Sequence, residues 1–250
     1  MKKSLLFISI IALLSEGLMA FEAGQLSLDT PNVLKKGEGS FGIRHRFFGE
    51  VTDTDKFLGT DDGGNMHFVL KYAVLLDNLV LSVDHTRDES AYGIGLEYSH
   101  DFEWIKTALR VNGFRLNKGL DKYDKSYQAI VALQTPNYFE HINFTANIGY
   151  DAYYEHHIAG FGVDINSENF LPFLTFTEKL SLLGEYYPQV DKVDGISKKY
   201  DSYAVGIKYQ TYGHHFEVMV TNSTNMDPRT MSLGTNSDKL HLGFNINRKF

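Results

Sequence analysis

The sequence lacks cysteine altogether, has five prolines and one tryptophan among its 250 residues, and shows no long apolar run beyond its N-terminus. Because an exported chain without cysteine cannot form disulfides, its stability must come from a sizeable core or from a closed sheet. No later stretch approaches the ~18 consecutive apolar residues of a membrane-spanning helix. The net charge of −7 argues against a nucleic-acid partner.

The one apolar run lies at the N-terminus and has the layout of a secretory signal peptide. Lys2 and Lys3 precede the apolar residues 5–14, and Ala20 supplies a small residue at the expected cleavage position. The run is too short to cross a hydrocarbon core of ~30 Å as a helix. The sequence therefore predicts export, with residues 1–20 removed.

Two further regions follow that cleavage position. Residues 21–37 are predicted to form a periplasmic N-terminal segment, and residues 38–250 one folded domain. A mature chain of about 230 residues suits one all-β domain better than two. The sequence leaves open whether the segment 21–37 stays loose or folds inward and plugs the domain.

Apolar and polar residues alternate along twelve segments of the mature chain. In the last of them Leu240, Leu242, Phe244 and Ile246 share one face, with polar or small residues between them. Segments of about ten residues with this period suit strands that cross a bilayer at a tilt, whereas strands of soluble sandwiches usually have about five or six. We therefore expect an all-β fold, a single transmembrane antiparallel β-barrel of about twelve strands, with ten or fourteen left open. The segments are 40–48, 65–74, 79–86, 91–99, 104–113, 125–134, 141–151, 156–165, 179–187, 201–210, 213–221 and 238–249.

The connectors between these segments alternate in length, which is a second and independent sign of a membrane barrel. Long connectors face outward and short turns face the periplasm when both termini are periplasmic. Two connectors do not fit this scheme. The connector 87–90 is short for an outer loop, and the connector 166–178 is long for a periplasmic turn, so we expect an extra strand or a short helix in it. The long connectors that fit are 49–64, 115–124, 188–200 and 222–237.

Tyrosines fall near the ends of the alternating segments, on the apolar face. Amphipathic aromatic rings gather at the two membrane–water interfaces and form girdles there. Tyrosine also favours strands in general, so its position at the strand ends is what favours a membrane barrel. The tyrosines concerned are Tyr72, Tyr92, Tyr98, Tyr150, Tyr186, Tyr203 and Tyr209.

The chain ends on an aromatic residue that continues an alternating segment. Phe250, Ile246 and Phe244 resemble the assembly signal of outer-membrane barrel proteins, which the barrel-assembly machinery reads. Arg248 departs from that pattern, since a hydrophobic residue is usual there. The resemblance implies an outer-membrane location in a Gram-negative bacterium, with outer-membrane lipid and that machinery as partners.

Several short motifs resemble one uncharacterised family of bacterial outer-membrane β-barrel proteins, a domain of unknown function. The family implies the fold and the location but no established activity, so the resemblance leaves the function open. The motifs are His45-Arg46-Phe47, Gly184-Glu185-Tyr186-Tyr187, Gly213-His214-His215-Phe216 leading into Thr221-Asn222-Ser223, and the closing Gly243-Phe244-Asn245-Ile246-Asn247-Arg248.

If the apolar face meets lipid, the alternate face meets the barrel lumen, and by this parity it carries charges of both signs. A charge on the lipid face costs ~2–4 kcal/mol at the bilayer midplane, so the consistent placement of charges on the other face supports a barrel. Arg44 and Arg46 share that face and would form an anion-facing ladder. The predicted lumen-lining residues are Arg44, Arg46, Lys71, Asp84, Glu97, Lys106, Arg110, Asp164, Glu185, Lys208 and Glu217.

These lumen charges favour a narrow channel for small polar or anionic solutes, formed by a monomer without a cofactor. About twelve strands lie between the ~8 of a filled barrel and the ~16 of an open pore, so the strand count does not decide the question. The alternative is a non-conducting structural or adhesin-like barrel, held closed by paired charges and acting through its outer loops. An outer-membrane lipid-modifying enzyme is the least favoured function.

Histidines are the residues that an enzyme or a metal site would use, and each candidate has a geometric objection. His214 lies about nine residues before Ser223, which is more than ~20 Å along an extended strand. His156 and His157 are adjacent and point to opposite faces of a strand, so they do not share one metal ion. The acidic stretch 53–62 lacks the ligand spacing of an EF-hand. We therefore expect no catalytic residue and no metal site.

Overall fold

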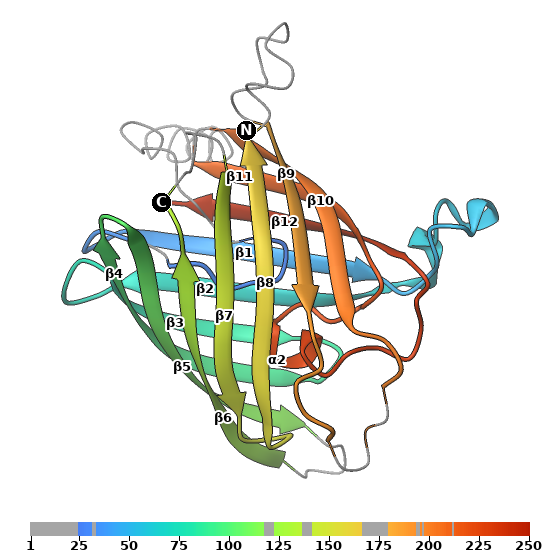
Figure 1. The fold of residues 1–250 in the computed structure, drawn as a ribbon, viewed down its shortest axis with the longest axis horizontal. Coiled ribbons are helices and arrows are strands. Elements are labelled where there is room, and N and C mark those ends of the chain that lie inside the picture. Colours follow the sequence, from blue (N-terminus) through green and yellow to red (C-terminus); the bar gives the residue numbers. More distant parts are fainter. Residues whose placement is uncertain are drawn as a thin grey trace, which may run out of the picture.

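The computed structural model describes residues 25–31, 34–117, 123–136, 142–166, 180–193, 196, 198–211 and 213–250. In this part of the chain, antiparallel strands close into a single barrel in which each strand pairs with its neighbours in chain order (Figure 1). The predicted fold class is therefore confirmed, with twelve strands. They are β1 (Gly39–Phe47), β2 (Gly64–Ala73), β3 (Leu79–Thr86), β4 (Ala91–Phe102), β5 (Ile105–Asn117), β6 (Tyr123–Gln134), β7 (Ile142–Asp151), β8 (His156–Asn166), β9 (Leu180–Tyr187), β10 (Ser202–Thr211), β11 (His214–Thr221) and β12 (His241–Lys249).

The first and last strands seal the barrel. In this pair Ile43 lies opposite Ile246 and His45 opposite Phe244. Phe250 and Gly39 exchange two backbone hydrogen bonds, each of 2.9 Å. Because both edge strands are paired, the sheet exposes no edge to further strand addition. The C-terminal alternating segment is thus the closing strand, although it begins at His241 rather than at residue 238.

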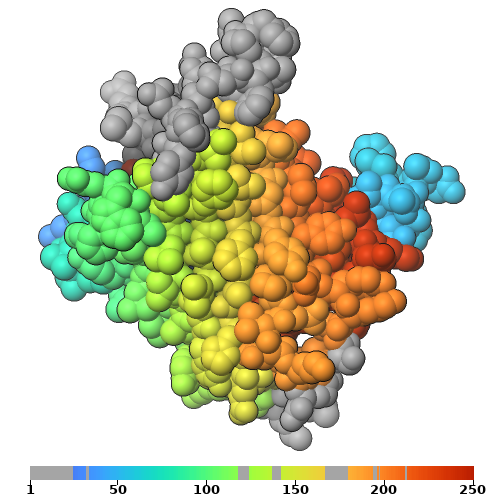
Figure 2. Space-filling view, in the orientation of Figure 1, coloured from blue at the N-terminus to red at the C-terminus, as the bar shows by residue number. Residues whose placement is uncertain are grey.

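The two ends of the barrel differ in what they carry. The end with the start of β1 and the end of β12 is called the termini end, and it also carries the short turn 74–78. The opposite end, the loop end, carries the connectors 48–63, 188–201 and 222–240. Of these, residues 48–63 (cyan) hold two short 3-10 turns and stand out from the barrel wall (Figure 2). The predicted signal peptide and most of the connector 166–178 lie outside the described residues.

Large apolar side chains cover the outside of the barrel. Strands β1 to β11 each expose at least one of them, and Ile94 keeps 64% of its surface accessible. In water, each Å² of such surface costs roughly 25 cal/mol, so a belt around the whole barrel suits lipid. One exposed residue from each strand is Phe41, Leu70, Val83, Ile94, Leu109, Val131, Ile148, Phe161, Leu182, Ile207 and Val218. No helix among the described residues is long and apolar enough to cross a membrane.

Exposed aromatic side chains border this belt at both ends of the barrel. Such rings favour the headgroup level, so their two rows indicate the two membrane interfaces. The row at the termini end contains Tyr72, Tyr98, Trp104 and Tyr209, and the row at the loop end contains Tyr92, Tyr127, Tyr150, Tyr186 and Tyr203. All seven tyrosines singled out in the sequence are exposed on the outside.

Candidate functional site in the barrel lumen

A piece of the N-terminal region lies inside the barrel. Residues 25–31, here called the lumen segment, are all buried, and Leu26, Ser27 and Leu28 have no accessible surface. Further along the chain, Leu34 packs against Ala73 and Val80 at the termini end. Part of the region predicted to be periplasmic therefore folds inward. The physical reason is that its leucines find apolar partners in the lumen.

The wall holds the lumen segment through hydrogen bonds to its backbone. On one side, the Glu185 carboxylate accepts the Ser27 N–H at 2.9 and 3.0 Å and the Leu28 N–H at 3.1 Å. Next along the segment, the Asn147 amide accepts the Asp29 N–H at 2.8 Å and donates to the Asp29 carbonyl at 2.7 Å. Each bond satisfies a backbone group that would otherwise be buried without a partner.

Donors on the sealing strands complete this set. Asn245 Nδ2 and an Arg46 guanidinium nitrogen both donate to the Leu26 carbonyl, at 2.8 and 2.9 Å. The Arg46 guanidinium also donates to Ser27 Oγ at 3.2 Å and to Asn245 Oδ1 at 2.9 Å. Arg46 has no accessible surface, so carbonyl, amide and hydroxyl oxygens in the lumen take the place of water around this cation.

Apolar side chains of the segment fill two pockets, one in the wall and one between the wall and the connector 222–240. Leu26 packs with Leu183, Ala204 and Met219. Leu28 packs with Tyr187 and Met231. Full burial of a leucine contributes ~1.5–3 kcal/mol relative to exposure, so the two pockets are a large part of what keeps the segment inside.

Two glycines on the lumen face of β8 leave the space that the segment occupies. A Cβ added at Gly160 would lie 2.7 Å from Leu28 Cδ2. One added at Gly162 would lie 1.9 Å from Gln25 Oε1 and 2.5 Å from Leu28 Cδ1. A side chain at either position would meet the segment, so the absence of a Cβ here is a requirement of the filled lumen.

A second segment enters the lumen from the loop end. The connector 222–240, here called the inward loop, contains the helical turn α2 (Pro228–Met231), whose N-cap Asp227 accepts the Thr230 N–H at 2.9 Å. Met231 has no accessible surface. Ser232 Oγ donates to the Ala159 carbonyl of β8 at 3.0 Å, which docks the turn against the inner wall.

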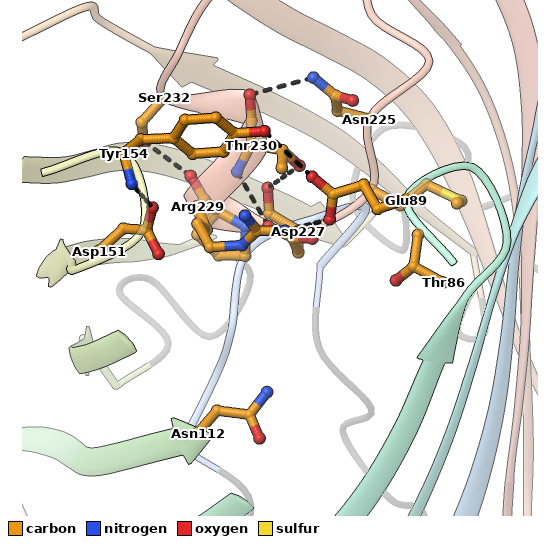
Figure 3. A network of polar contacts seen from close by, with 12 residues as sticks. Thr86, Glu89, Asn112, Asp151, Tyr154, Asn225, Asp227, Arg229, Thr230 and Ser232 are labelled. Atoms are coloured by element: carbon orange, nitrogen blue, oxygen red, sulfur yellow. Dashed lines mark hydrogen bonds and ion pairs between the residues drawn. The ribbon is translucent and has the colours of Figure 1, made fainter. Parts of the chain in front are cut away.

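Arg229 is the centre of the polar network around this loop (Figure 3). Its guanidinium forms an ion pair with Glu89, from the β3–β4 turn, and lies over the rings of Phe114 and Tyr154 at 4.7 and 5.6 Å. Tyr154 in turn donates to Glu89 at 3.4 Å. Burial raises the pKa of Glu89 above its ordinary value, although Arg229 opposes the shift. Burial, assisted by the Glu89 carboxylate, raises the pKa of Tyr154 to about 12.

Arg44 joins the two segments. One of its guanidinium nitrogens donates to the Ser27 carbonyl of the lumen segment at 3.3 Å and to the Met226 carbonyl of the inward loop at 2.6 Å. Beside this contact, between the segments and the wall of β2 to β6, lies a polar cavity of about 40 Å³ that reaches Asp29 and Arg110. A cavity of that size holds a few waters and is no continuous pore.

The predicted lumen-lining residues lie on the inward face of the wall. Arg110 forms an ion pair with Asp29 of the lumen segment at 2.8 Å. Elsewhere Lys71 pairs with Glu97 at 3.1 Å, Lys208 pairs with Asp164, Asp84 accepts from Asn112 at 3.1 Å, and Glu217 accepts from Asn245. Lys106 lies nearest the termini end, in a groove that the buried Gln134 and Asn143 also line. Arg44 and Arg46 form no open ladder, because their guanidinium groups bind the two inserted segments.

The histidine candidates are separated as the strand geometry requires. His214 begins β11, whereas Ser223 follows the other end of that strand. His156 points inward, where its Nε2 lies 3.1 Å from the Arg229 carbonyl oxygen, and His157 points outward to Asp191 at 2.8 Å. Among the residues that the structure describes, no group of three or more His, Asp or Glu side chains could hold a metal ion.

The sequence alone did not identify the residues that hold the segments, above all Asn147, Asn245 and Arg229. Two signals were present. Glycines occupy inward positions of β8 and β10 (Gly160, Gly162 and Gly206), where a barrel filled only by its own wall would carry larger side chains. Apolar residues also stand in connectors that would otherwise be exposed to water, as in Leu26, Leu28 and Met231.

Known proteins resemble the chain in part of its sequence and in its fold. Residues 169–250 match the family model of a membrane bound beta barrel domain (DUF5777), which confirms the predicted resemblance to an uncharacterised barrel family. No curated protein sequence matches. The location predicted from the sequence is confirmed as well: this is an outer-membrane β-barrel, with its apolar belt in the bilayer.

Solved structures of porins share the fold. The KdgM porin superposes with a TM-score of 0.53 at 10% identity, over 84% of this chain and 99% of that chain. The KdgM porin in complex with disordered oligogalacturonate gives 0.53 at 11% identity, over 84% and 99%. The NanC porin in its rhombohedral crystal form gives 0.47 at 9% identity, over 84% and 98%. At such identities the likeness to the two KdgM structures shows the fold alone.

Proposed function

We propose that this barrel is an outer-membrane channel for small polar or anionic solutes, and that the lumen segment closes it in the state described above. The observation that carries the proposal is that the strand ladder is complete without the segment, since β1 pairs directly with β12. The segment is attached to the wall by side chains only, so it can leave the lumen without breaking any strand pairing of the barrel.

The charges that face the lumen support an anion preference of the open channel. The predicted lumen-lining set contains six cations and five anions. Asp29 of the segment compensates Arg110 in the closed state. Departure of the segment removes that carboxylate and also frees Arg46 from the Leu26 carbonyl. A cationic excess in a narrow lumen favours anions.

Planar-bilayer recording tests the proposal. The full chain should conduct poorly, whereas the variant Leu26→Asp/Leu28→Asp should conduct, because two carboxylates cannot remain in apolar pockets. The matched control is Leu26→Met/Leu28→Met, which keeps apolar volume and should stay closed. In the open variant, Arg44→Glu should shift the reversal potential toward cations. If the folded Asp variant shows no conductance over a range of salt concentrations, the proposed channel function is wrong.

A non-conducting barrel is the second candidate, and the filled lumen favours it. The cavity beside the lumen segment and the inward loop has a volume of about 40 Å³. On this alternative the segments act as a core that stabilises the barrel, and the loops at the loop end make the functional contacts. The Asp variant would then lose thermal stability without gaining conductance, so the same experiment separates the two functions.

A further inference from the structure

We propose that the lumen is a binding site for short peptides, and that residues 25–31 occupy it as a ligand tethered to the same chain. This inference rests on the proposed channel in one respect, because it names the class of solute that the channel would take. The binding site itself does not depend on conductance.

The wall recognises peptide backbone. Glu185 accepts two successive backbone N–H groups, and Asn147 forms a reciprocal pair with both backbone groups of Asp29. Asn245 and Arg46 converge on one carbonyl. Backbone groups are common to all peptides, so these contacts give affinity for an extended peptide whatever its sequence.

The side chains of the segment enter distinct sites. Leu26 and Leu28 occupy separate apolar pockets, and Asp29 meets the Arg110 guanidinium at 2.8 Å. Apolar pockets combined with a charged partner are how peptide sites obtain specificity beyond the backbone. The preferred ligand is therefore a short peptide with two apolar residues at alternate positions, followed by an acidic residue.

The residues that tether the segment to β1 lie outside the site. Lys35, Lys36 and Gly37 are exposed at the termini end, between the buried Leu34 and the start of β1. The lumen segment has no helix or strand of its own, and its described hydrogen bonds run to the wall. It is thus bound as a separate peptide would be.

Binding in trans is the decisive experiment. The full chain carrying Leu26→Asp/Leu28→Asp, with folding verified by heat-modifiable gel mobility, presents a vacated lumen. A fluorescent synthetic peptide with the sequence of residues 25–31 should bind it saturably in an anisotropy titration. The same peptide with aspartate in place of both leucines should bind at least about tenfold more weakly, since each buried leucine contributes more than the ~1.4 kcal/mol that a factor of ten requires.

A matched pair of wall variants separates recognition from charge. Added to the vacated chain, Glu185→Gln should lower the affinity for the peptide by about tenfold or more, because it places an amide where a carboxylate accepts two N–H groups. Glu97→Gln removes the same charge from a lumen side chain that pairs with Lys71, and should leave the affinity within about threefold. Equal loss in both variants would overturn the assignment of Glu185 as a ligand of the peptide.

A cleaved wild-type chain keeps the proposal testable if the vacated variant fails to fold. A protease recognition sequence inserted between Lys35 and Lys36 allows the tether to be cut in the folded barrel. The cut piece should stay with the barrel through gel filtration and exchange with the labelled peptide. Immediate loss of the piece, with no binding of the peptide, would overturn the proposal. Conductance without peptide binding would support the proposed channel and overturn the peptide site. Peptide binding without conductance would support the peptide site and overturn the channel.

Discussion

The two segments that meet in the lumen are held in different ways. The inward loop carries its own structure, with a helical turn, an N-cap and a buried arginine, and one of its ion-pair partners comes from a neighbouring turn. The lumen segment carries none, and the wall satisfies its backbone groups one by one. The difference indicates that the inward loop is a folded part of the barrel, whereas the lumen segment behaves as a bound ligand. Four changes test that contrast.

The largest effect is expected from Arg229→Ala. Removing one partner of a buried ion pair costs ~3–5 kcal/mol, here because Glu89 would remain buried without its cation. Hydrogen exchange should show faster exchange of amides in residues 222–240, with residues 25–31 still protected. The exposed Arg87→Ala is the control. Equal loss of protection in both segments would mean that they form one cooperative unit.

Arg44→Met should have a smaller effect that is spread over both segments. It removes charge-assisted hydrogen bonds to the Ser27 and Met226 carbonyls, each worth ~1.5–3 kcal/mol at most. Exchange should accelerate at residues 25–31 and at residues 222–240 together. A change confined to one segment would show that the bridge does not couple them.

Gly162→Leu should affect the lumen segment alone. The added side chain overlaps Gln25 and Leu28, and overpacking of this kind costs ~1–3 kcal/mol. Conductance should increase, while the inward loop stays docked. Gly184→Leu is the matched control on the next strand, where an added Cβ meets only Val163 at 3.4 Å. If both leucine variants behave alike, the glycine is not what admits the segment.

The smallest expected effect is a pH dependence of the docking of the inward loop, which arises from protonation of Glu89. The pKa of Glu89 is raised by burial in the docked state, so the docked loop binds this proton more tightly than the released loop does. Its contribution to docking is therefore complete below the ordinary glutamate pKa of about 4.3 and is lost as the pH rises through the raised value. Protection of residues 222–240, corrected for intrinsic exchange, should be greater at pH 5 than at pH 7.5. Glu89→Gln should lose that difference.

Most of the wall could be predicted because its signal is local. The alternation of Tyr203, Val205 and Ile207 with smaller or polar residues identifies β10 without any knowledge of its neighbours. The strand ends were predicted less accurately. The fifth segment was expected to end at residue 113, whereas β5 continues to Asn117 through the inward-facing Phe114 and Leu116. Apolar residues on the lumen face break the alternation, and they are explained only by the cluster they form with Ala91 and Tyr153.

The inserted segments could not be located from the sequence because their partners are remote in the chain. Ser27 is 158 residues from Glu185, and Asp29 is 118 residues from Asn147. Nothing in the alternation of either strand distinguishes those inward residues from others on the same face. Likewise, Arg44 and Arg46 carry the charge expected of an anion ladder. Only the tertiary structure reveals that their guanidinium groups donate to backbone carbonyls of the inserted segments.

The sequence by itself determined the barrel, the face that each strand turns to lipid, the closing strand and the location in the outer membrane. The barrel and its lipid face follow from a period of two, which depends on the residue and its nearest neighbours. The closing strand and the location follow from the signal-peptide layout and from the aromatic end of the chain. Whether the lumen is open or filled was decided by the tertiary structure. That question depends on whether the backbone of residues 25–31 finds acceptors, donors and apolar pockets on strands more than a hundred residues away, and no local pattern records such a match.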